Sequence, residues 1–130
     1  YPHFVSLNYI FYVLFNYFFH KFSINTDCWM SFPKIVFEAK HYANFQWNAL
    51  ALGKPVAQLD EWIQQSEESC EDKDKWLLCV KISRQGSFVL WDSTHWNDLK
   101  YSNTYRAKYC YLEFADFWSA NSRQIKEQSV

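Results

Sequence analysis

Glycine and proline are scarce in this chain of 130 residues, which holds two glycines and three prolines. A loop-built disulfide scaffold needs more turn residues than this, so that class is excluded. Aromatic residues instead make up 22% of the chain, a proportion that excludes intrinsic disorder. With no internal repeat or linker, the length predicts a single domain over residues 1–130 with a real hydrophobic core.

The chain also lacks a strong excess of either charge. Its 13 Lys and Arg side chains and 14 Asp and Glu side chains give a net charge of −1. This balance gives no support for nucleic-acid binding. It does not exclude that class, because a local basic groove is what nucleic acid requires.

No CxxC pair occurs among the four cysteines, and the four histidines show no zinc-ligand spacing with them. Cys28, Cys79 and Cys110 fall in predicted strands, where a free thiol packs as a small hydrophobe. Disulfides are the competing interpretation for a secreted chain. We expect reduced thiols and an intracellular, cytoplasmic protein.

Charged side chains are absent from residues 4–19. This run is shorter than the roughly 20 apolar residues that a membrane span needs, and Ser6, Asn8 and Asn16 interrupt it. The basic start and cleavage site of a signal peptide are missing too. The spacing of polar residues predicts an N-terminal aromatic helix over residues 1–21, packed on a sheet. A membrane anchor formed by residues 4–19 is the alternative.

Residues 22–126 alternate between strand-like and helix-like stretches. The pattern predicts a mixed central β-sheet flanked by helices, which is an α/β class. The expected strands cover residues 22–28, 35–40, 75–82, 87–91 and 109–112, and the expected helices cover residues 43–52, 55–66 and 114–125. Residues 92–108 show no firm period and are expected to be irregular.

The turn signal Phe32-Pro33 lies between two strand-like stretches and predicts an antiparallel hairpin. In a register centred between these residues, Asp27 lies opposite Glu38, and Lys40 shares their face. The other face, with Ile35, Phe37 and Ala39, suits a core. Two carboxylates and an ammonium in one patch suit Mg²⁺, which takes one or two carboxylates and a substrate phosphate.

Asp27, followed after ten residues by Glu38-Ala39-Lys40, resembles the signature of the PD-(D/E)xK nucleases. The resemblance implies a restriction-endonuclease-like fold and a metal-dependent deoxyribonuclease of the Holliday-junction-resolvase or phage type, acting in a host cell if phage-encoded. It implies Mg²⁺, with Mn²⁺ as a substitute, held by Asp27, Glu38 and the main chain of Ala39. Lys40 would position or activate the attacking water. No small-molecule cofactor is implied.

Two positions depart from the family pattern. Thr26 stands where the family has proline before the aspartate, and residues 1–26 contain no acid that could be a further metal ligand on the first helix. The missing acid puts a two-metal mechanism in doubt. It also leaves open a catalytically silent relative that binds nucleic acid or protein.

Other side chains are candidates for the same site or for DNA. Several families place a glutamine on the helix after the motif strand; among Gln58, Gln64 and Gln65 we take Gln64 as the catalytic candidate, with solvent exposure as the alternative. Further candidates are contacts to DNA, duplex or branched, and they are His41, Lys81 and Arg84. The resemblance also implies that a homodimer could pair two active sites to cut both strands.

Overall fold

The computed structural model describes residues 26–32, 35–70 and 75–128, without the side chains of residues 26–32 and 126. The helix expected over residues 1–21 therefore lies outside the described residues. Within the described ranges, no helix combines the length and apolar character that crossing a membrane requires.

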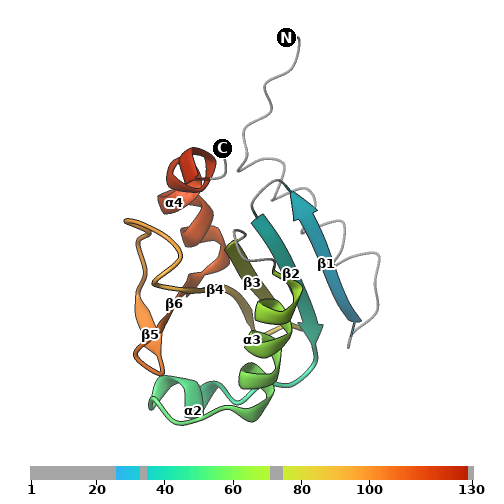
Figure 1. The fold of residues 1–130 in the computed structure, drawn as a ribbon. Coiled ribbons are helices and arrows are strands. Elements are labelled where there is room, and N and C mark those ends of the chain that lie inside the picture. Colours follow the sequence, from blue (N-terminus) through green and yellow to red (C-terminus); the bar gives the residue numbers. More distant parts are fainter. Residues whose placement is uncertain (1–25, 33–34, 71–74, 129–130) are drawn as a thin grey trace.

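Along the described chain, a pair of strands is followed by two helices, four further strands and a last helix (Figure 1). The strands are β1 (Thr26–Phe32), β2 (Ile35–Tyr42), β3 (Lys75–Ile82), β4 (Gly86–Asp92), β5 (Asn103–Tyr105) and β6 (Tyr109–Glu113). The helices are α2 (Trp47–Ala51), α3 (Ala57–Ser69) and α4 (Phe114–Gln128).

The six strands form one mixed sheet in the order β1-β2-β3-β4-β6-β5. Strands β2 and β3 are parallel, and the other neighbouring pairs are antiparallel. A parallel pair cannot be joined by a tight turn, so the chain crosses over between β2 and β3 through α2 and α3 (Figure 1). The prediction of an α/β class with a mixed sheet and helices is confirmed.

Helices cover both faces of the sheet. Side chains alternate between the two faces along each strand, so each helix packs against its own set of strand residues. We call the side that packs against α3 the α3 face and the side that packs against α4 the α4 face. The core under α3 contains Val36, Leu59, Trp62, Ile63, Trp76, Leu78, Val80, Phe88 and Leu90. The core under α4 contains Ile35, Phe37, Ala39, Leu77, Cys79, Val89, Trp91, Phe117 and Trp118. Strand β3 is thus buried on both faces, as its sequence predicts.

The register of the β1–β2 hairpin differs from the prediction by two residues. Asp27 pairs with Lys40 rather than with Glu38, and Glu38 pairs with Trp29. The predicted register put Phe32 directly opposite Pro33 and left no residues for the turn. In the structure Phe32 pairs with Ile35, so two residues connect the strands, the commonest short hairpin connection.

Other element boundaries shift by up to four residues, and β1 extends to Phe32 rather than to residue 28. Strand β3 spans the predicted residues, while α2 begins at Trp47 rather than at residue 43. Helix α2 ends before Gly53, whose φ of 70° is the left-handed conformation expected of a glycine stop. The stretch expected to be irregular contains β5, a three-residue strand too short to give a periodic signal.

The β5–β6 hairpin fastens the far edge of the described sheet to the start of α3. Arg106 donates to Asp60 of α3 through Nε at 2.9 Å and Nη2 at 2.7 Å, and Tyr105 Oη donates to the same carboxylate at 2.6 Å. The Arg106 hydrogen bond, with that of Tyr105, holds the pKa of Asp60 below its ordinary value although burial opposes the shift. The backbone N–H of Val56 donates to Tyr105 Oη at 2.9 Å. These contacts contribute, with the core packing of Leu59, Trp62 and Ile63, to the position of α3 over the sheet.

The turn of this hairpin places two side-chain-bearing residues in the left-handed region, Arg106 at φ 51° and Ala107 at φ 57°. Ala107 is exposed, so its methyl group has little packing to lose. We expect Ala107→Gly to raise the free energy of unfolding by about 1 kcal/mol, because glycine adopts this conformation without steric cost. Urea denaturation measures the change. The control, Ala120→Gly inside α4, should lower stability by about 1 kcal/mol, and a destabilised Ala107→Gly variant would contradict the prediction.

Candidate active site between β2 and α3

Glu38 and Lys40 lie on the α3 face of β2 and are both buried, with 4% and 1% of their surface exposed. They point to the same side because they are two residues apart in one strand. Strand β2 is paired on both sides, with β1 and with β3, and α3 covers it. A carboxylate and an ammonium are thus placed inside the protein at neighbouring positions.

Hydrogen bonds from α3 orient both charged groups. Ser69 Oγ donates to Glu38 Oε1 at 2.7 Å, and Lys40 Nζ donates to Gln65 Oε1 at 2.5 Å. Lys40 Nζ also lies 3.9 Å from Glu38 Oε2. A buried charge is tolerated when it is paired and hydrogen-bonded, and these contacts supply both conditions.

The direction of α3 explains why these residues of the helix reach the pair. The helix crosses β2 in the opposite direction, so that Trp62 packs on Tyr42 at 4.9 Å while Gln65 meets Lys40 and Ser69 meets Glu38. Residues three or four apart share one side of a helix, which brings these three side chains into a row over the strand.

Gln64, the glutamine favoured by the sequence, does not take part. It is exposed, and its amide nitrogen donates to Glu68 Oε1 of the same helix at 3.0 Å. Gln65 is the glutamine that contacts Lys40. The apolar stripe of α3 carries a signal for this difference, because at 100° per residue Gln64 falls nearly opposite Leu59, Trp62, Ile63 and Ser66, whereas Gln65 falls at the edge of the stripe.

The two other predicted metal ligands are placed by the strand register. The backbone of Asp27 pairs with that of Lys40, in the edge strand next to β2. Ala39 lies between Glu38 and Lys40, pairs with Cys28 and Cys79, and turns its side chain to the α4 face. Among the side chains that the structure describes, no three of His, Cys, Asp and Glu gather as a metal-binding group.

The predicted DNA contacts do not converge with Glu38 and Lys40. His41 and Lys81 are neighbours in the parallel pairing of β2 and β3, and both lie at odd positions, which belong to the α4 face. His41 is buried, so it is not a ready surface contact. Arg84 is exposed in the turn between β3 and β4. These three residues therefore stay predictions that the site geometry does not support directly.

A second polar cluster surrounds Asp92 at the end of β4, and the sequence reasoning missed it. Asp92 Oδ1 accepts from the backbone N–H of Thr94 at 2.9 Å and from its hydroxyl at 2.7 Å, and Oδ2 lies 3.4 Å from Lys108 Nζ. Burial raises the pKa of Asp92, but the Thr94 hydrogen bonds and the charges of His95 and Lys108 together hold it below its ordinary value. The Asp-Ser-Thr segment was a signal for such a turn. The cluster closes the loop between β4 and β6.

Chemically, the Glu38–Lys40 pair offers one hard oxygen donor and one oriented cation in a place that excludes bulk water. Preorganised charges act more strongly in such a site than in water, and they need no reorganisation during a reaction. No protein-family model, curated protein or solved structure matches the chain.

Proposed function

We propose that the chain is a metal-dependent endonuclease that hydrolyses DNA phosphodiester bonds through metal-activated water. The proposal takes the fold to be restriction-endonuclease-like and the type to be that of Holliday-junction resolvases or phage nucleases. In the sheet, a hairpin bearing Asp27 and Glu38-x-Lys40 leads through α3 to a strand parallel to β2. This order of a motif-bearing hairpin, helices and a further strand supports the proposal.

The observation that carries the proposal is the buried, hydrogen-bonded Glu38–Lys40 pair. An arrangement needed only for solubility would leave both side chains in water, where long charged side chains are normally found. Here α3 contributes Gln65 and Ser69 to fix them. Such support from a neighbouring element is what a preorganised reaction site needs.

Asp27, Glu38 and the main-chain carbonyl of Ala39 would hold Mg²⁺, and their donor atoms fit it because all are oxygen. When bound, the ion would polarise the phosphodiester and lower the pKa of a bound water. Glu38 supplies the fixed carboxylate. Lys40 positions the attacking water or offsets negative charge on the phosphate, and Gln65 holds Nζ of Lys40 in place.

One observation favours a second candidate. Glu38 and Lys40 are exposed by only 4% and 1%, so a phosphate does not reach them without a local movement of the covering groups. A catalytically silent relative that binds nucleic acid or protein would have no need of such access. In that case the pair is a structural ion pair between β2 and α3.

Incubation of the full chain with linear duplex DNA and with four-way branched DNA separates the two. We expect cutting in Mg²⁺ or Mn²⁺ and none with a chelator, because the carboxylates alone cannot activate water sufficiently. The branched substrate tests the resolvase type, and light scattering tests the homodimer. Absence of cutting of either DNA in both metals, with the protein folded, would exclude the nuclease.

A further inference from the structure

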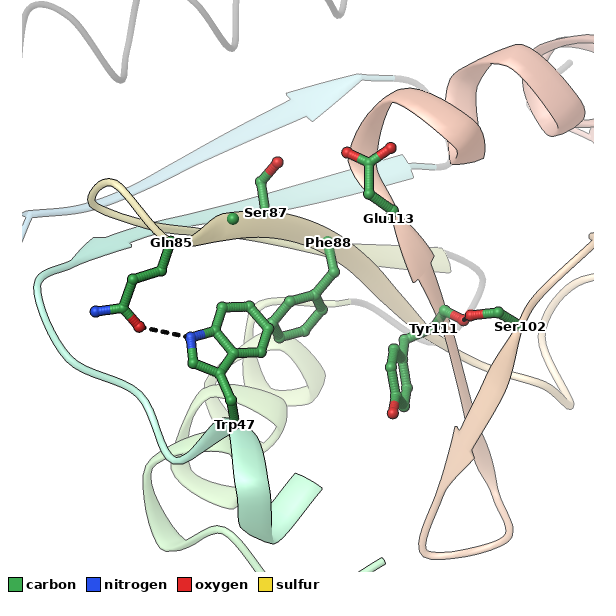
Figure 2. A pocket seen from close by; sticks show the side chains of 8 residues that line it. Trp47, Gln85, Ser87, Phe88, Ser102, Tyr111 and Glu113 are labelled. Carbon is green, nitrogen blue, oxygen red and sulfur yellow. Dashed lines mark hydrogen bonds between the residues drawn. The ribbon is translucent and has the colours of Figure 1, made fainter. Parts of the chain in front are cut away.

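A pocket of about 570 Å³ opens between α2, β4 and β6 and is lined by aromatic side chains (Figure 2). Trp47 comes from the first turn of α2, Phe88 from β4 and Tyr111 from β6. The Trp47 and Phe88 rings lie edge to face at 5.7 Å, and Phe88 and Tyr111 are 5.8 Å apart. Gln85, Gly86, Ser87, Ser102 and Glu113 complete the lining.

The Trp47 ring is held in position before any ligand arrives. Its Nε1 donates to Gln85 Oε1 at 2.7 Å, as the dashed line in Figure 2 shows, and Gln85 Nε2 donates to the carbonyl of Ala43 at 3.3 Å. Phe45 packs against the same ring at 5.0 Å. The hydrogen bond at Nε1 and the contact with Phe45 already hold the ring in place. Stacking of a ligand on it therefore costs little conformational entropy.

The charges around the pocket favour a neutral group over an anionic one. Of the described residues that line it, none is Lys or Arg. The carboxylate of Glu113 accepts from the backbone N–H groups of Ala115 at 3.1 Å and Asp116 at 3.0 Å, so it is engaged as a cap of α4. The Ser102 hydroxyl donates to the carbonyl of Tyr111 at 3.3 Å and keeps acceptor capacity at the rim.

The pocket shares a face and a cross-strand row with the candidate active site. Lys40 pairs with Val80, Val80 with Phe88, and Phe88 with Glu113. Neighbouring strands are about 4.8 Å apart, so the backbones of Lys40 and Phe88 are separated by about 10 Å. Val80, which lies between them, belongs to the core under α3, so this distance is measured through the core and not along the surface.

We infer that this pocket binds an unpaired nucleobase of the DNA substrate, stacked against Trp47, Phe88 and Tyr111. The inference rests on the proposed nuclease function, which supplies DNA as the ligand. Aromatic side chains bind unpaired bases through the π-face that every base presents, and this stacking does not depend on the base sequence. Branched DNA, at its junction, offers such bases where a continuous duplex does not.

The test measures binding rather than cutting. Fluorescence anisotropy, in a chelator, compares a labelled oligothymidylate with a strand of equal length and charge that carries abasic sites throughout. We expect the strand with bases to bind at least about 5-fold more tightly, since stacking of one base is worth about 5- to 150-fold in affinity. Tyr111→Leu and Trp47→Leu should each remove most of this difference while leaving the affinity for the abasic strand unchanged.

Tyr101→Ala is the matched control, because Tyr101 is an exposed tyrosine next to Ser102 that does not line the pocket. It should keep the preference for bases. Equal affinities for the two strands, a preference that survives in both pocket variants, or no binding of either strand would overturn the inference. A preference for bases without any cutting would support base binding in the pocket and would contradict only the proposed nuclease function. Failure of the inference and failure of the proposed function can therefore be told apart.

Discussion

Replacement of Lys40 by methionine is expected to lower the rate of metal-dependent DNA cutting by about 10²- to 10³-fold, the usual cost of removing one preorganised charge or donor from an active site. Methionine has a similar length but no charge, so it fills the space under α3 without leaving a cavity. Lys40→Ala should lose at least as much activity. Initial rates on the same DNA, with binding measured in a chelator, locate the loss in the chemical step.

The matched control for this variant is Gln64→Ala on α3. Gln64 is exposed and contacts Glu68, so its removal should leave the cutting rate within about 2-fold of the unaltered protein. Gln65→Ala removes the acceptor that fixes Lys40 Nζ and should fall between the two. Cutting at the normal rate by a folded Lys40→Met protein would show that Lys40 has no part in the reaction.

Element identity was predictable because the apolar pattern decides it. Strand β3 reads as apolar at nearly every position, and this identified a strand buried on both faces with its exact bounds. The hairpin register was not predictable to the residue, because Phe32-Pro33 marks a turn without saying how many residues the turn uses. The offset of two residues still keeps each position of β2 on its predicted face, since strands have a period of two.

The residues that β2 contributes to the site were predictable from the sequence, and those that α3 contributes were less so. Positions 38 and 40 share a face by spacing alone, and the same rule puts His41 on the other face, which the choice of His41 as a DNA contact ignored. The identity of Gln65 depended on the rotation of α3 about its axis. The burial of Lys40 depended on where α3 lies over the sheet, which long-range contacts such as that of Arg106 with Asp60 determine. No local pattern encodes them.

Because its partner is buried, Glu38 is expected to be worth more to stability than any exposed carboxylate of the chain. Glu38→Ala would leave the ammonium of Lys40, 1% exposed, without the carboxylate 3.9 Å away, and would remove the acceptor of Ser69 Oγ. We expect the free energy of unfolding to fall by about 3–5 kcal/mol, the cost of breaking a buried ion pair from one side. Urea denaturation at neutral pH measures it.

The double variant Glu38→Ala with Lys40→Met should be more stable than Glu38→Ala alone, because the buried ammonium is then removed together with the carboxylate that lies 3.9 Å from it. A coupling energy above about 1 kcal/mol in this double-mutant cycle would establish the pair as an interacting unit. Glu68→Ala, an exposed carboxylate on the same helix, should change stability by no more than about 0.5 kcal/mol. If Glu38→Ala cost as little as Glu68→Ala, water or another anion would compensate the Lys40 ammonium, and the Glu38–Lys40 pair would not be a source of stability.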